Sequence, residues 1–460
     1  MGFGEITTGL SVCLIAFGLK GQTQQLLVCY FLVASVILFC RLNVLLGIEA
    51  TRFGIKNASI DAIFLVPGLV IIFLYLVETG KPVCSWIWAV GSILMLISVF
   101  GSRSAVISTA VIITLVWIKR FNSRWLIIPV LAIFIALLAY KSDSTIGRTY
   151  IYKTTLHLIS NKPLFGYGAT PFEYEYNRLQ ARVIQDEFRA NGEFKPIHYR
   201  TDYVSQPYNE LLYRFYQVGF VGIAILLLVL FRLRRYFNIF PLTPYSIFIL
   251  SILLASSFYC ILRYPLFLFM VVYPAIINTK TSVCRIRIVN VILLASLIVL
   301  YVIELQKNIS WAKANRELNI NPQAAIADYK RLYLQLQFNP YFLEEYALAQ
   351  YTYGTDSGET YRALLVAATI SSNPSIHLAL GEQFEEGRNF QAALKEYSFC
   401  AFHSPKRIFP KYKLMNLYSK MAFSDSARFW AKQLRITPSS GNNIMQVNEI
   451  LMRSESVGRK

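Results

Sequence analysis

Two patterns of hydrophobic and polar positions divide the chain near residue 305. Before that point, apolar runs of about 15–25 residues recur, and a membrane-crossing helix needs about 20 such residues. After it, apolar residues recur at helical spacing between polar ones, which is typical of amphipathic helices in water. We therefore expect an all-α protein with a polytopic transmembrane helix bundle at residues 1–304 and a helical extramembrane domain at residues 305–460.

The apolar runs predict about ten membrane spans. They lie at about 5–19, 24–48, 60–79, 83–100, 104–119, 124–140, 208–231, 245–262, 264–278 and 287–304. Basic clusters at residues 119–124, 232–235 and 280–287 separate some of these runs, and such clusters mark the cytoplasmic side. The turn at 102–103, the long loop at 141–207 and everything after the last span then lie on the outer side.

Composition supports a membrane protein. The 460 residues are 55% hydrophobic and 15% charged, whereas soluble proteins carry about 25% charged residues. The net charge of +19 comes from short clusters between apolar runs, not from one soluble face, so we expect membrane lipids and no nucleic acid as partners. The seven cysteines form no CxxC pair and no Cys/His cluster with metal-ligand spacing, so we expect no metal and no cofactor.

The region after residue 305 has an internal period. Its Asn-Pro, Ser-Pro and Thr-Pro pairs place prolines at intervals of 34, 31 and 33 residues, at Pro340, Pro374, Pro405 and Pro438. A period of about 34 is typical of tetratricopeptide repeats, and an unrelated array of helical hairpins is the alternative. Within one unit, Gly381 and Ala393 allow two helices to approach closely, while Phe384 and Tyr397 fill the gap. Such stacks bind peptides on concave surfaces, which makes a protein partner possible.

The loop at 141–207 is too long for a tight turn, and loops of that length are usually functional. It is rich in Tyr, Arg and Glu. Residues 171–189 can form a helix near the membrane surface, and the glycines and proline of residues 163–168 predict a tight turn.

Four segments on the expected outer side contain the candidate chemistry. They are the turn Ser102-Arg103-Ser104-Ala105, the pair Gly147-Arg148, the stretch Pro163-Leu164-Phe165-Gly166-Tyr167-Gly168, and Tyr208-Asn209 followed by Gly219 and Gly222. An arginine at the membrane edge is costly unless it is paired or faces water. The two last glycines are three residues apart, which suits close packing of one helix face.

In this order, the four segments resemble the O-antigen ligase family, which includes protein O-oligosaccharyltransferases and is related to O-antigen polymerases. The resemblance covers residues 95–235 or so. The family's arginine in the outer turn corresponds to Arg103, and the arginine that opens its large loop corresponds to Arg148. The family's His-Asn-x9-Gly-x-x-Gly motif aligns with Tyr208 and Asn209, so a tyrosine replaces the histidine.

The resemblance implies a glycan ligase of the bacterial inner membrane, with the repeats in the periplasm. It would transfer a glycan from a polyprenyl diphosphate to a hydroxyl of lipid A core or of a protein, by an inverting reaction without a metal. As catalytic residues we expect Arg103, Arg148, Tyr208, Asn209 and His198, and as substrate-binding residues Ser102, Lys153, Arg200, Asp202, Glu210 and Arg214. Planar guanidinium groups hold phosphate oxygens bidentately, which suits them to a departing diphosphate.

The general base is open, because a tyrosine with a pKa near 10 is a poor base at neutral pH. His198, Asp202 and Glu210 are the candidates. Three other functions remain as alternatives: an O-antigen polymerase, which extends one lipid-linked glycan with another; a catalytically inactive membrane scaffold that presents the repeats; and a transporter, which the scarcity of charges inside the spans disfavours.

Overall fold

The computed structural model describes residues 82–98, 103–121, 142–233 and 306–437, together with a few positions between residues 66 and 80. Every regular element in these parts of the chain is helical, as the hydrophobic patterns predict. The other expected spans lie wholly or partly outside the described residues, so the ten-span bundle stays a prediction.

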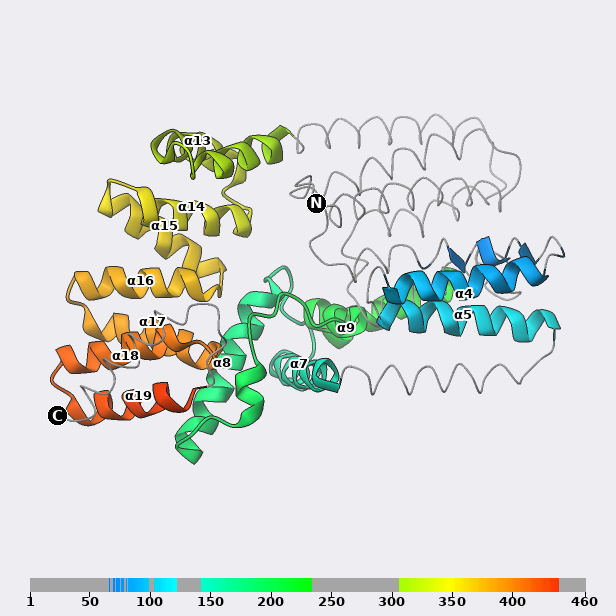
Figure 1. The fold of residues 1–460 in the computed structure, drawn as a ribbon, viewed down its shortest axis with the longest axis horizontal. Coiled ribbons are helices and arrows are strands. Elements are labelled where there is room, and N and C mark those ends of the chain that lie inside the picture. Colours follow the sequence, from blue (N-terminus) through cyan, green and yellow to red (C-terminus); the bar gives the residue numbers. More distant parts are fainter. Residues whose placement is uncertain are drawn as a thin grey trace. The chain divides into compact units, whose positions relative to one another are not determined.

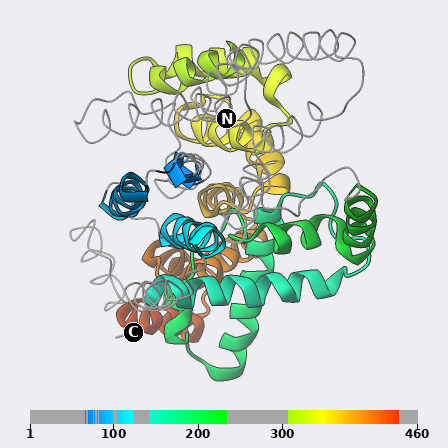
Figure 2. The ribbon, with the colours of Figure 1, turned by 90° about the vertical axis from the view of Figure 1, so that its right-hand side faces the viewer.

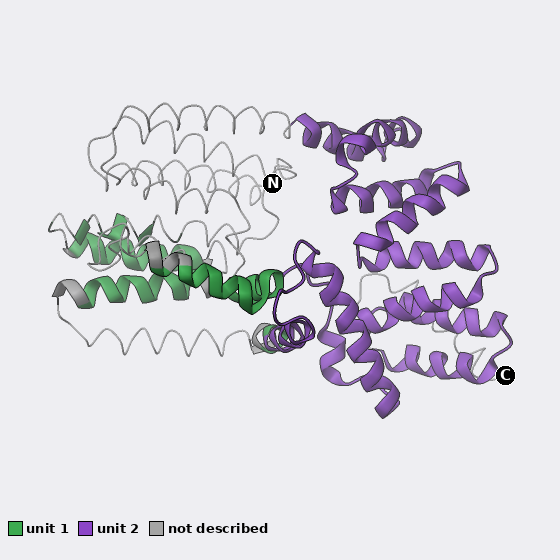
Figure 3. Cartoon of the chain, turned by 180° about the vertical axis from the view of Figure 1, so that it is seen from behind, with its two compact units in different colours: residues 1–148, 207–305 green, residues 149–206, 306–460 purple. Residues whose placement is uncertain are grey.

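The chain forms two compact units, and both are discontinuous in sequence (Figure 3). Unit 1 comprises residues 1–148 and 207–305, and unit 2 comprises residues 149–206 and 306–460. The pattern change near residue 305 anticipates the start of the tail. It does not anticipate that most of the long loop packs with that tail.

The described residues of unit 1 include the apolar helices α4 (Pro82–Ser98), α5 (Arg103–Phe121) and α9 (Glu210–Leu233), besides some helical positions between residues 66 and 77. α4 packs beside α5, and the rings of Trp86 and Trp117 lie 4.7 Å apart between their centroids. Many large apolar side chains on α4 and α9 are exposed, as expected for helices that face lipid.

One helix in the described parts is long and apolar enough to cross a membrane, over 19 residues from Glu210 to Leu228. The apolar segments Val83–Ile97 and Ala105–Ile118 are shorter. α9 is not straight. Gly219 has φ 62° and ψ −169°, a conformation open essentially to glycine, and a Cβ on Gly222 would lie 2.4 Å from Cβ of Val218. The two glycines therefore form a kink rather than one regular packing face.

In unit 2, the tail is a stack of helices, each of which contacts the next (Figures 1 and 2). Its helices are α13 (Pro322–Leu336), α14 (Pro340–Tyr353), α15 (Ser357–Ile370), α16 (Pro374–Glu386), α17 (Phe390–His403), α18 (Ile408–Lys420) and α19 (Ser424–Ile436). α14, α16 and α18 begin at residues 340, 374 and 408, at intervals of 34 residues. The period expected from the sequence is thus a period of helix pairs, while membership of the tetratricopeptide class stays a prediction.

The Asn-Pro pairs of the tail begin helices. The side chains of Asn321, Asn339 and Asn373 each accept a hydrogen bond from a backbone N–H of the first turn, and proline follows as the first helical residue. Asparagine satisfies an otherwise unpaired N–H at this position, and proline has no N–H to leave unpaired. Gly381 of α16 lies against the ring of Tyr397 in α17, where an added Cβ would be 2.5 Å from Cε1.

The long loop folds into helices as well. α7 (Ser142–Asn161) is followed by a turn, α8 (Phe172–Asn191) and the short 3-10 helix η2 (Pro196–Arg200). The helix expected at 171–189 is therefore present. Its apolar face packs on the tail, since Ala181, Ile184 and Phe188, together with Phe194 after the helix, share one hydrophobic core with residues of α17, α18 and α19.

Candidate functional site

The start of α9 brings Tyr208 and Arg148 together in unit 1. The guanidinium carbon of Arg148 lies over the Tyr208 ring, 5.6 Å from its centroid. Tyr208 has a φ of 52°, in the left-handed region that a bulky side chain rarely adopts. Strained backbone of this kind persists where the surrounding structure holds it, and it concentrates at functional sites.

The next residues form a short polar network on the first turns of α9. The side chain of Asn209 accepts a hydrogen bond from the N–H of Leu212 at 3.0 Å, so this motif residue is the N-cap of the helix. Glu210 is buried and accepts a hydrogen bond from Nε of Arg214 at 2.7 Å. Arg214 also donates to Oε1 of Gln217 at 2.9 Å.

This arrangement is chemically suited to an anion. A helix N-terminus presents unpaired N–H groups and a partial positive charge. Arg148 adds a guanidinium held in place by an aromatic face, and such a cation–π contact contributes roughly 0.5–1 kcal/mol at an exposed site. Glu210 supplies the one carboxylate among the predicted residues of unit 1, and Arg214 orients it.

Two predicted site residues cannot be placed. α5 begins at Arg103, whose side chain lies outside what the structure describes, and Ser102 lies outside it entirely. The expected meeting of Arg103 with Arg148 around one diphosphate therefore stays a prediction.

His198 is almost fully buried in unit 2. Its Nδ1 accepts a hydrogen bond from the backbone N–H of Lys195 at 3.2 Å, so its proton lies on Nε2, which faces Oε2 of Glu187 at 3.1 Å. Burial lowers the pKa of this imidazole, although Glu187 opposes the shift. Both ring nitrogens are engaged, and the structure offers no lone pair of His198 for a substrate proton.

Asp202 is bound by the tail. Its carboxylate lies 2.6 Å from Nζ of Lys406 and 3.3 Å from Nη2 of Arg407, and it also accepts the backbone N–H of Tyr203. Although burial opposes it, hydrogen bonding to Lys406 and Tyr203 lowers the pKa of Asp202 to about 2. A carboxylate this acidic is a weak base, and its contacts are those of an anchor.

The remaining predicted residues of unit 2 are solvent-facing. Lys153 lies exposed on α7, and Arg200 lies exposed at the end of η2. The turn at 163–168 forms as expected, with left-handed φ values of 66° at Gly166 and 64° at Gly168. The exposed Leu164 and Phe165 project from it.

Sequence reasoning missed Asn177, which is fully buried on α8 and connects the loop with the tail. An asparagine among the apolar positions of an amphipathic helix was the available signal. Within the described residues, no group of three or more His, Cys, Asp or Glu residues has a geometry that could hold a metal ion.

The fold and this site define a helical membrane protein with a cationic polar site at the start of a membrane-crossing helix. Residues 62–227 match the family model of O-antigen ligase. The matched segment contains all four sequence motifs and ends before the tail. Comparisons with curated proteins and with solved structures gave no significant match.

The match to this family indicates a bacterial inner-membrane enzyme of the glycosyl-transfer type, a glycan ligase or polymerase in lipopolysaccharide biosynthesis. It also implies lipid-linked glycans as substrates. The matched segment includes Arg148, Tyr208, Asn209 and Glu210, the residues that the start of α9 brings together.

Proposed function

We propose that this protein is a glycan ligase that transfers an oligo- or polysaccharide from a polyprenyl diphosphate to an acceptor hydroxyl. The acceptor is lipid A core or a protein, and the reaction inverts the anomeric carbon without a metal. The observation that supports this most is the Arg148 guanidinium, held over the Tyr208 ring at the N-terminus of α9.

The physical requirement of the reaction is charge stabilisation on the leaving group. As the glycosidic bond breaks, the diphosphate gains negative charge, and preorganised donors aimed at that charge lower the barrier. A guanidinium presents a planar fork that matches two phosphate oxygens. Arg148 and the partial positive charge at the N-terminus of α9 together supply such stabilisation, and Arg103 is the second arginine that we expect to join them.

The acceptor hydroxyl must lose a proton as it attacks. Of the three base candidates, Glu210 is the one in unit 1 with Arg148 and Tyr208, while His198 and Asp202 are engaged within unit 2. We assign Glu210 as the general base, with Arg214 orienting its carboxylate. Asn209 holds the helix start and Tyr208 lines the site.

The test uses the full-length protein in nanodiscs with a lipid-linked oligosaccharide as donor and either lipid A core or an acceptor peptide. Arg148→Lys and Arg148→Gln should each lower kcat/KM by about tenfold or more, since a point charge cannot replace the bidentate fork. Arg182→Gln, at an exposed position on α8, is the matched control and should leave transfer unchanged.

The products separate the possible functions. Glycan on lipid A core or on the peptide supports the ligase. A longer lipid-linked glycan, formed without either acceptor, means that the protein is a polymerase. No transfer by the wild type means a scaffold, and full activity of Arg148→Gln removes the proposed role of that arginine.

A further inference from the structure

A single buried amide joins three parts of unit 2. The Asn177 side chain on α8 contacts Val204, in the stretch that leads toward α9, and it also contacts Ser372 and His403 of the tail. Its Nδ2 donates to the Val204 carbonyl at 3.1 Å, and its Oδ1 accepts the Val204 N–H at 3.0 Å. Asn177 thus pairs with both backbone groups of Val204, as a neighbouring strand would.

This pairing determines the protonation of His403. Because the Val204 N–H is a donor, the atom facing it must be the amide oxygen of Asn177, and that oxygen lies 3.2 Å from Nε2 of His403. Nε2 must then carry the proton and donate. In the neutral ring Nδ1 then carries no proton; it lies 3.0 Å from Oγ of Ser404, whose hydroxyl donates to Oδ1 of Asp202 at 3.1 Å. A neutral imidazole in one tautomer therefore completes the contact between loop and tail.

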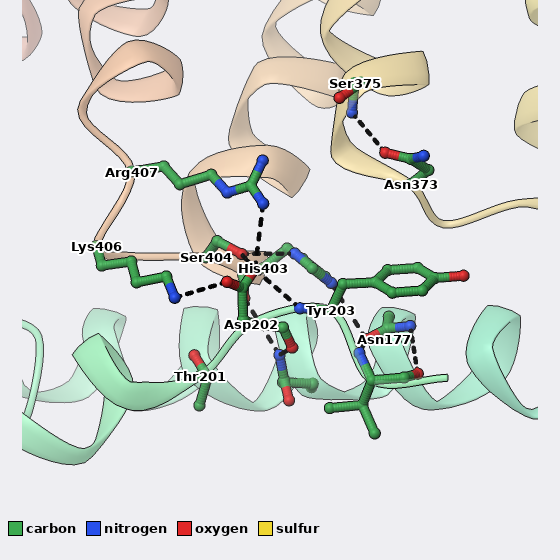
Figure 4. A network of polar contacts seen from close by, with 12 residues as sticks. Asn177, Thr201, Asp202, Tyr203, Asn373, Ser375, His403, Ser404, Lys406 and Arg407 are labelled. Atoms are coloured by element: carbon green, nitrogen blue, oxygen red, sulfur yellow. Dashed lines mark hydrogen bonds and ion pairs between the residues drawn. The ribbon is translucent and has the colours of Figure 1, made fainter. Parts of the chain in front are cut away.

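A second set of contacts holds the same stretch two residues earlier. Asp202 pairs with Lys406 and Arg407, which follow His403 in the turn between α17 and α18 (Figure 4). On α8, Gln180 donates to the His403 carbonyl at 3.2 Å, and Arg178 donates to the Ala368 carbonyl at 3.2 Å. Gln180 also donates to the Asp202 carbonyl at 3.3 Å. Residues 202–204 are therefore held by the tail through Asp202 and by α8 through Gln180 and Asn177.

Residues 202–204 lie shortly before the motif Tyr208-Asn209 at the start of α9. Val204 is four residues before Tyr208, a stretch that spans at most about 14 Å, so holding Val204 narrows the range of positions open to Tyr208 and Asn209. A catalytic group displaced by about 1 Å can cost 10²-fold in rate. Restraint at Val204 is therefore a means of controlling a site in which Tyr208 already has a strained backbone.

We propose that the tail is a positioning element of the transfer reaction: through His403 and Asn177 it holds Val204, and so sets the course of the chain into Tyr208 and Asn209. This rests on the proposed function of the site. The surface of α17 that faces α8 is in this view occupied by the chain's own loop, not by a recruited protein.

The experiment compares two neutral replacements of His403 in the full-length protein in nanodiscs. In His403→Gln, the longer amide can place a donor where Nε2 was. In His403→Asn, the shorter amide places its nitrogen near the former position of Nδ1. The hydrogen-bond donor to Oδ1 of Asn177 is therefore lost. His377→Asn is the control, because His377 is a buried histidine of α16 whose contacts with Glu396 and Ser371 lie within the tail.

Two readouts are measured, amide hydrogen exchange of residues 201–206 and kcat/KM for transfer at equal amounts of folded protein. We expect His403→Asn to raise exchange and to lower kcat/KM by about tenfold. We expect His403→Gln to restore both toward wild type and His377→Asn to change neither by more than about twofold.

Three results would overturn the proposal. One is faster exchange in His403→Asn with unchanged transfer, which would mean that the tail holds the loop without serving catalysis. Another is unchanged exchange, and the third is an equal loss of transfer in His377→Asn. A wild type without transfer activity would refute the proposed function and with it the positioning role, while the exchange data would still decide whether His403 holds the loop.

Discussion

Arg148 and Tyr208 lie 60 residues apart in sequence, yet the guanidinium of the first lies over the ring of the second. The contact uses the face of the ring and does not need the hydroxyl group. Tyr208, which stands at the position of the family's histidine, therefore has a physical role that needs no acid–base chemistry: its ring holds the Arg148 guanidinium in place.

Tyr208→Phe should keep transfer within about threefold of wild type, because phenylalanine keeps the aromatic face over which Arg148 lies. Tyr208→Leu removes that face, so Arg148 loses the contact that positions it, and kcat/KM should fall by about tenfold. Both variants keep a bulky side chain at a φ of 52°, so the strain is matched. Abolished transfer in Tyr208→Phe would instead make the hydroxyl the catalytic group.

Glu210→Gln should lower kcat by about 10²–10⁴-fold, the usual contribution of a general base, and should remove the fall in rate at acid pH. Arg214→Gln breaks the same ion pair but keeps the carboxylate, so it should cost less. Asp202→Asn and His198→Gln should each change the pH profile little. Equal losses in Glu210→Gln and Arg214→Gln, with no change of profile, would show that only the ion pair matters.

Gly381→Ala should destabilise the tail by roughly 1–3 kcal/mol, because the new methyl group would overlap the buried Tyr397 ring. The higher helix propensity of alanine offsets part of this loss. Gly387→Ala is the matched control, since its Cβ would lie 3.4 Å from the Gln383 carbonyl and meet nothing closer. Thermal unfolding followed by hydrogen exchange in the tail measures both, and a neutral Gly381→Ala would contradict the packing of α16 on α17.

Acidification should loosen the loop from the tail. Burial lowers the pKa of His403 to about 3, and Asp202 opposes this while Arg407 and His377 add to it. The unfolded state, with an ordinary histidine pKa near 6.5, then binds more protons, so stability is full above about pH 6.5 and falls as the pH drops toward 3. Asp202, with a pKa of about 2, stays ionised through most of this window.

The measurement is hydrogen exchange of residues 172–206 at pH 7.5 and at pH 5.5, corrected for the intrinsic rates. Wild type should show weaker protection at the lower pH. His403→Gln cannot take up a proton and should show a smaller change, with the remainder due to His198, whose pKa burial also lowers. Identical pH dependence in the two proteins would exclude His403 as the titrating group.

The local features of the fold were predictable from the sequence, because short-range physics determines them. Asn339 and Asn373 precede prolines at helix starts, and the glycines of residues 163–168 require left-handed turns. The family assignment also followed from the motifs, and residues 62–227 confirm it.

The long-range contacts were not predictable in the same way. His198 and Asp202 were chosen as base candidates for their side-chain types, and nothing local indicates that Glu187 engages one and that Lys406 and Arg407 bind the other. The left-handed backbone of Tyr208 likewise depends on its surroundings, since a tyrosine has no intrinsic preference for that region.

The discontinuity of unit 2 has a consequence for how the protein folds during its synthesis. The ribosome makes residues 149–206 about 100 residues before the tail begins, so Phe188 and Phe194 must wait for the aromatic side chains of Phe402 and Trp430 that cover them. During that interval the loop exposes an apolar surface of the kind that chaperones and proteases recognise. In a chain truncated before α17, this apolar surface of the loop would stay exposed permanently.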